Sequence, residues 1–114
     1  MLIYKILRTN EWADLQRDGE SPGAPVDVAD GYVHFSTAEQ LPVTLGKHFA
    51  DARDLTLLAV DADAVAPDLR WEPSRGGALF PHLYRALRIA DIAWSRPIEN
   101  GPDGPLVPDL TAQP

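Results

Sequence analysis

The densest run of side chains that could do chemistry in this chain is Gly31–Thr37, with Gln40 one helical turn further on. On a strand, His34 and Ser36 point to one face and their apolar neighbours to the opposite face. If the strand runs into a helix N-terminus, an imidazole, hydroxyls and free backbone N–H groups would meet there and could receive an anion or a carboxamide oxygen. The alternative is structural, with Ser36 capping the helix and His34 bonded to a backbone carbonyl.

A second group of polar and aromatic residues runs over Trp71–Gly77 and continues over Phe80–Tyr84. Its glycines permit close approach to a ligand, and Arg75 offers a planar guanidinium to a phosphate or carboxylate. His82 and Tyr84 project to the same side of a strand, where they can add hydrogen bonds or a stacking surface. The alternative is a tight turn with a solvated Arg75, beside aromatic side chains that fill the core.

Metal and nucleophile sites have weaker support in the sequence. Among the three histidines, His34, His48 and His82, no pair has the i, i+4 or i, i+2 spacing typical of metal ligands, so we predict no metal site. The absence of cysteine excludes disulfides, thiolate ligands and a cysteine nucleophile. Ser36 lacks the flanking glycines of a nucleophile elbow, and no P-loop or Rossmann glycine signature occurs.

Length and charge narrow the class of protein. The 114 residues, 12.5 kDa, suit one domain over residues 1–98, followed by a tail over 99–114 that is rich in proline and glycine. Ten basic against seventeen acidic residues give a net charge of −7, which disfavours duplex nucleic acid as a partner. The chain shows neither a secretory signal nor a long apolar run, so we expect a cytoplasmic protein without a membrane partner.

Strands and helices in the N-terminal half must position these residues. Leu2–Leu7 predicts a strand with Tyr4 and Ile6 on one face and Ile3, Lys5 and Leu7 on the other. A helix is expected from Thr9 or Asn10 to a stop at Gly19. The Pro- and Gly-containing, acidic segment Glu20–Asp30 is typical of an exposed loop.

A second helix and further strands complete the expected elements. Ser36-Thr37-Ala38-Glu39 fits a capping box, and a helix should follow from Pro42 to about Arg53. Leu55–Asp61 has apolar residues on both faces, which predicts a central strand covered on both sides. We expect an α+β fold with mostly antiparallel strands and helices mainly in the N-terminal half. Additional strands are predicted at Leu69–Glu72, His82–Leu87 and Ala93–Ile98.

With these motifs, the chain resembles the small bacterial family called domain of unknown function 952 over residues 3 to about 98. That family resembles the ADP-ribosylation fold, in which two small sheets flank a cleft that holds NAD. The matching segments, in order, are Ile3-Tyr4-Lys5-Ile6, Asp30–Thr37 with Gln40, Leu57-Leu58 with Asp61, Trp71-Glu72, and Phe80–Tyr84.

The resemblance implies a nucleotide-like or NAD-derived ligand, with NAD as substrate or ligand, and an activity similar to ADP-ribosyl or 2′-phosphotransferases. His34 and Glu72 would be catalytic, with Glu72 or His34 stabilising an oxocarbenium ion, although the Gln-x-Glu or Glu-x-Glu pattern of such transferases is absent. The alternative is a non-catalytic accessory or protein-interaction domain with no nucleotide ligand. The ligand-binding residues implied by the resemblance and the motifs are Ser36, Thr37, Gln40, Arg75, His82 and Tyr84.

Overall fold

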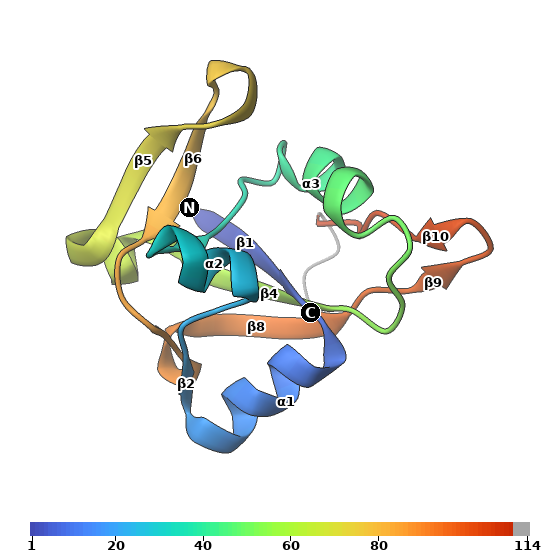
Figure 1. Ribbon diagram of the computed structural model, residues 1–114, viewed down its shortest axis with the longest axis horizontal. Helices are drawn as coiled ribbons and strands as arrows, with labels where there is room; N and C mark the ends of the chain where they lie inside the picture. Colours follow the sequence, from blue (N-terminus) through green and yellow to red (C-terminus); the bar gives the residue numbers. More distant parts are fainter. Residues whose placement is uncertain (111–114) are drawn as a thin grey trace.

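The computed structural model describes residues 1–110, apart from the side chain of Arg75. Within this range the strands form two three-stranded sheets and two two-stranded ribbons, and every pairing is antiparallel (Figure 1). The three α-helices found there all belong to the N-terminal half of the chain. The predicted class, α+β with small antiparallel sheets, is confirmed.

The first sheet has the strand order β1 (Leu2–Leu7), β4 (Thr56–Asp61) and β8 (Ile92–Pro97). Both faces of β4 are covered, because Leu57 belongs to one apolar cluster and Leu58 to another. The predicted central strand is therefore confirmed. The two faces of β1 also divide as predicted: Tyr4 and Ile6 pack in the cluster that contains α3, and Ile3 and Leu7 in the cluster that contains α1.

The helices follow the predicted pattern except in two places. α1 (Thr9–Asp18) ends at Gly19 in the left-handed conformation, as predicted. α3 (Leu41–His48) ends five residues before Arg53, because the chain must reverse to enter β4 and does so with a positive φ of 57° at Asp54. The segment predicted as an exposed loop instead contains β2 (Glu20–Ser21) and α2 (Pro25–Asp30).

The second sheet has the order β3 (Val33–His34), β6 (Leu79–Leu83) and β5 (Leu69–Pro73). Its β5–β6 hairpin projects from the body of the molecule (Figure 1). The predicted strand His82–Leu87 begins earlier and ends at Leu83, so its first residue lies near the end of β6. The remaining elements are η1 (Ala62–Asp68), η2 (Arg75–Gly77), β7 (Leu87–Arg88), η3 (Ile89–Asp91), β9 (Asn100–Gly101) and β10 (Gly104–Pro105).

One backbone bridge joins the two sheets. Tyr4 of β1 and Ser36, two residues beyond β3, exchange N–H···O bonds of 2.8 and 2.9 Å. The pairing is isolated, so β1 and β3 separate on either side of it. This separation places the free edge of β1 opposite the polar face of β3.

Residues 99–110 pack back on the body. β9 and β10 form a short hairpin, and Arg53 donates a 3.0 Å hydrogen bond to the carbonyl of Gly101. The last four residues of the predicted tail, 111–114, lie outside the described residues. No helix within residues 1–110 has the length and apolar character needed to cross a membrane.

Candidate functional site

A pocket of about 510 Å³ opens where β1 and β3 separate. Side chains from both sheets and from α3 line it, including all three histidines of the chain. Five described lining residues are of basic type and none is acidic: Lys5, Arg8, His34, His48 and His82. Such a lining suits an anionic small molecule, in a chain whose net charge is −7.

Asp27 of α2 bonds to two residues that line this pocket, Lys5 and His34. Its side chain is fully buried and accepts four hydrogen bonds. The donors are Nζ of Lys5 at 2.7 Å, the backbone N–H of Ala24 at 2.6 Å, and both the backbone N–H and Nδ1 of His34, at 3.0 and 2.6 Å. Burial opposes ionisation, but the bonds from His34 and the charge of Lys5 outweigh it and lower the pKa of Asp27 to about 2.

His34 is bonded to carboxylates through both ring nitrogens. Nδ1 lies 2.6 Å from Asp27, and Nε2 lies 2.9 Å from an oxygen of Asp30. A carboxylate accepts hydrogen bonds and donates none, so this geometry suits an imidazole with a proton on each nitrogen. To use Nε2, a ligand must displace Asp30, whose side chain is 44% exposed.

His82 is held by a second carboxylate on the neighbouring strand. It is 2% exposed and lies directly opposite His34 in the β3–β6 register, with the two rings 5.2 Å apart. Glu72 of β5 accepts from Nδ1 of His82 at 2.8 Å and from the hydroxyl of Tyr84 at 2.6 Å. These two hydrogen bonds lower the pKa of Glu72, and the bond to Glu72 raises the pKa of the Tyr84 phenol.

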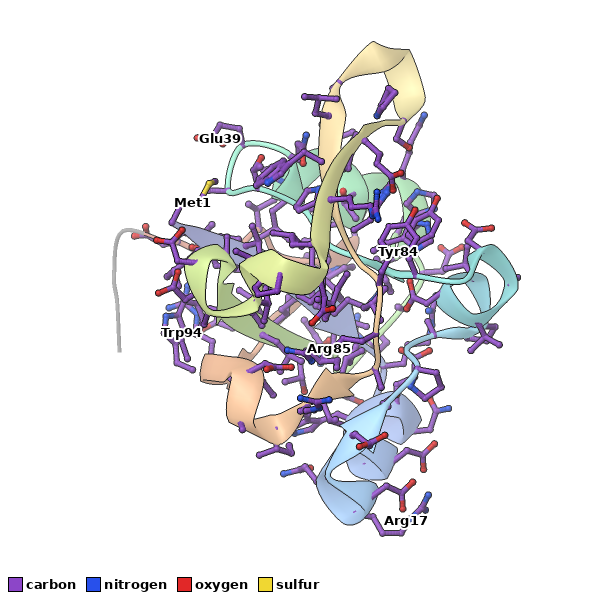
Figure 2. The ribbon with its side chains drawn as sticks, turned by 90° about the vertical axis from the view of Figure 1, so that its left-hand side faces the viewer. Met1, Arg17, Glu39, Tyr84, Arg85 and Trp94 are labelled. Carbon is purple, nitrogen blue, oxygen red and sulfur yellow. The ribbon has the colours of Figure 1, made fainter. Side chains whose placement is uncertain are left out.

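Tyr32 packs against the rings of this group. Its ring centroid lies 4.6 Å from His34, 4.2 Å from His82 and 5.1 Å from Tyr84. Figure 2 shows Tyr84 beside the β5–β6 hairpin, on the side that faces α2. The stack fixes both imidazoles in orientation.

Arg8 supplies a further cation to the pocket lining. Its guanidinium lies 4.7 Å above the ring of Phe49 and donates a long bond of 3.4 Å to the carbonyl of His48. In the described part of the chain, no carboxylate forms an ion pair with it. A smaller neighbouring cavity shares Arg8 and His48 and adds Lys47 and Asp51, so Arg8 lies where the two cavities meet.

The predicted site residues whose side chains are described fall into three groups. His34, Ser36 and His82 line the pocket, and Ser36 shares a 2.9 Å hydrogen bond with Thr44. Glu72 and Tyr84 do not line it but bond as described above. The predicted capping box is shifted by one residue: Thr37 and Gln40 bond reciprocally and organise the turn before α3, outside the pocket lining. The side chain of Arg75 lies outside the described structure.

Sequence reasoning missed Asp27, Lys5 and Arg8 as site residues. Asp27 was hidden in a segment interpreted as a solvated loop. Lys5 was the available signal. It shares a face of the predicted strand with Ile3 and Leu7, and a lysine buried among apolar side chains needs an acidic partner. Within residues 1–110 no three or more potential ligands are grouped to hold a metal ion.

We expect Asp27 to make the protein acid-sensitive. The pKa of Asp27 falls from 3.8 to about 2 on folding, so its contribution is present above pH 3.8 and is lost as the pH falls through 2. At about 1.36 kcal/mol per pKa unit, the loss is on the order of 2 kcal/mol. Denaturant unfolding at a series of pH values should show this difference between the wild type and Asp27→Asn. Identical pH slopes in the two proteins would contradict it.

Known proteins give a family and a fold for this arrangement. Residues 6–95 match the family described as protein of unknown function (DUF952). Protein CC0527 from Caulobacter crescentus has 44% sequence identity with this chain, and the match covers 93% of this chain and 94% of CC0527. Its crystal structure superposes on this one with a TM-score of 0.89. The solution NMR structure of CC0527 is also 44% identical, with coverages of 91% and 90% and a TM-score of 0.81.

Both structures of CC0527 are structural genomics targets. No curated protein matches the chain. The predicted likeness to the ADP-ribosylation fold stays a prediction, whereas the predicted family is confirmed. On the match over residues 6–95 and on its identity with CC0527, the chain belongs to the DUF952 family of proteins of unknown function.

Proposed function

We propose that the pocket binds a nucleotide-like small molecule that carries phosphate, of which NAD and its derivative ADP-ribose are examples. The observation that carries the proposal is the lining, which holds five basic-type residues and no acidic one among the described residues. The carboxylates that bond to Lys5, His34 and His82 are not among the lining residues. The guanidinium of Arg8 forms no ion pair with a carboxylate of residues 1–110 and is left as a donor to a ligand.

The size and walls of the pocket support the same class of ligand. A volume of about 510 Å³ lies within the range of about 300–1,000 Å³ that is usual for small-molecule sites. The rings of Tyr4, Phe49 and Phe80 are among the lining, and they offer flat apolar surface to a base. The hydroxyls of Ser36 and Thr44 can bond to ribose.

Arg8 is the residue best placed to meet a phosphate. A guanidinium bonds phosphate oxygens in pairs, and no carboxylate of residues 1–110 competes for this one. Stacking on Phe49 holds the guanidinium at the junction of the two cavities. Its bond to the His48 carbonyl is long, so little is lost when a phosphate replaces it.

Replacing Arg8 by alanine should weaken binding of ADP-ribose about 10- to 100-fold, because hydrogen bonds to charged groups contribute about 1.5–3 kcal/mol. Calorimetric titration with ADP-ribose and with NAD at moderate salt measures the effect. Arg17→Ala is the matched control: it removes the same charge from α1, at the end of the molecule away from Tyr84 (Figure 2), and should leave affinity unchanged.

Two results would contradict the proposal. The first is no heat with either ligand up to millimolar concentration, which would favour the alternative of a protein-interaction domain without a nucleotide ligand. The exposed Trp71 and Leu79 of the projecting β5–β6 hairpin would then be the first surface to test for a protein partner. The second is equal weakening by Arg8→Ala and Arg17→Ala, which would show a general effect of net charge.

A further inference from the structure

We propose that His82 is a general base that activates water to cleave a phosphodiester of the bound nucleotide, with Glu72 and Tyr84 as positioning residues. The inference rests on the proposed function, because it places the substrate in the same pocket. It goes further by assigning a reaction class and a reacting atom, Nε2 of His82.

The bond to Glu72 sets the tautomer of His82. Hydrogen bonds from Tyr84 and His82 lower the pKa of Glu72, so its carboxylate is ionised at neutral pH and only accepts. Nδ1 of His82, at 2.8 Å from Oε1 of Glu72, must therefore carry a proton. In the neutral imidazole the lone pair is then on Nε2, which is the arrangement that a general base requires.

The surroundings of Nε2 point it toward the pocket. His82 lines the cavity, and no hydrogen-bond partner for Nε2 is found among the described residues. Among the described residues, one side-chain nitrogen or oxygen is both fully enclosed and without a hydrogen-bond partner, and it is Nε1 of Trp94. Nε2 of His82 is therefore not fully enclosed. His82 as a whole is 2% exposed, and Nε2 therefore belongs to the small accessible surface of a residue that lines the cavity.

His34 cannot serve in the same way. Both of its nitrogens are bonded to carboxylates, Nδ1 to Asp27 and Nε2 to Asp30. It presents no lone pair to a substrate while these bonds last. Of the two imidazoles that face each other across β3 and β6, His82 is the one that can accept a proton.

The charge of the pocket distinguishes the reaction class. Cleavage of a glycosidic bond builds positive charge on the ribose and needs a nearby carboxylate. No acidic residue is among the described lining, and the nearby Glu72 is already bonded to His82 and Tyr84. Attack on phosphorus instead places negative charge on the phosphoryl oxygens, which Arg8 can stabilise.

The proposed step needs only the phosphodiester, one water molecule and His82. The oxygen of a water molecule forms a bond to phosphorus while Nε2 of His82 takes one of its protons. The bond from phosphorus to the leaving oxygen breaks, and that oxygen keeps the electron pair. The imidazolium of His82 then returns the proton to the leaving oxygen, giving a phosphomonoester and an alcohol with no change of oxidation state.

The test uses 2′,3′-cyclic AMP, a strained phosphodiester, with the full chain and ³¹P NMR as the readout. The wild type should give adenosine monophosphate. His82→Asn should lower the rate at least 100-fold, within the usual range for a general base. Arg17→Ala should match the wild type, and circular dichroism checks that each variant is folded.

Glu72→Gln provides a second variant and tests positioning. The amide can still accept from Nδ1 but carries no negative charge to stabilise the imidazolium that forms, so kcat should fall while KM stays close to that of the wild type. A purely structural role for Glu72 would disturb the pocket and change KM as well. That result would overturn the assigned role of Glu72.

Binding of 2′,3′-cyclic AMP is measured by calorimetry on the same samples, which separates the two proposals. Binding without hydrolysis would overturn the proposed reaction while leaving the ligand class intact. No binding of 2′,3′-cyclic AMP, NAD or ADP-ribose would overturn both the ligand class and the reaction. A third outcome is that the protein releases nicotinamide from NAD, that Glu72→Gln abolishes this release, and that 2′,3′-cyclic AMP is not hydrolysed. That outcome would assign the pocket to glycosidic cleavage and overturn the phosphodiester inference.

Discussion

Replacement of Asp27 by alanine is expected to lower the free energy of unfolding by about 3–5 kcal/mol. The substitution removes the partner of Lys5, a lysine that is only 7% exposed, and leaves its ammonium group buried without a carboxylate. It also deprives Nδ1 of His34 and two backbone N–H groups of their acceptor. Urea denaturation followed by circular dichroism measures the change.

Two further variants test whether the buried charge is the cause. Adding Lys5→Met to Asp27→Ala removes the unpaired ammonium group and should restore part of the lost stability. Asp14→Ala, which removes an exposed carboxylate from α1, should change stability by less than about 0.5 kcal/mol. If Asp27→Ala cost no more than Asp14→Ala, the proposed role of Asp27 as the organiser of the pocket would be wrong.

The sheet β1-β4-β8 was predictable because the order of apolar and polar residues along its strands indicates which faces are buried. Alternation in β1 separates Tyr4 and Ile6 from Ile3 and Leu7, and the uninterrupted apolar run of β4 fits a strand covered on both faces. These patterns depend on local geometry alone. The helix α1 followed for the same reason, since Gly19 supplies the left-handed residue that ends it.

The second sheet and the pocket depend on contacts that local pattern does not encode. Proline, glycine and three acids made Glu20–Asp30 resemble a solvated loop. Asp27 is nevertheless buried, because its carboxylate accepts hydrogen bonds from Lys5 and His34, which are 22 and 7 residues away in the sequence. Arg8 was overlooked because a single arginine after a strand carries no spacing signal. Its position opposite Phe49 arises only when α3 folds against β1.

The two motifs that the sequence singled out do meet, but with a different division of roles. His34 and Ser36 both line the pocket. Glu72 was assigned a direct catalytic role, whereas the structure bonds it to His82 and Tyr84. Pairing between β5 and β6 brings them together, and that register could not be derived from either segment alone.

Gly23→Ala should lower stability by about 3 kcal/mol and weaken ligand binding. Gly23 has a φ of 101°, which an L side chain adopts at a cost of about 1–3 kcal/mol. An added Cβ would also lie 2.7 Å from Cβ and Cγ of Asp27, too close for two carbon atoms. Asp27 must then shift within its bonded group, and thermal unfolding and ADP-ribose titration report the two consequences.

Two other glycines separate backbone strain from the contact with Asp27. Gly31→Ala meets a similar strain, with a φ of 86° but nothing within 4 Å, so it should cost only about 1–2 kcal/mol. Gly46→Ala lies inside α3 in open space and should stabilise the protein by about 0.5–1 kcal/mol. If Gly23→Ala matched Gly31→Ala in both stability and affinity, Asp27 could move freely, and its packing against Gly23 would not position the pocket.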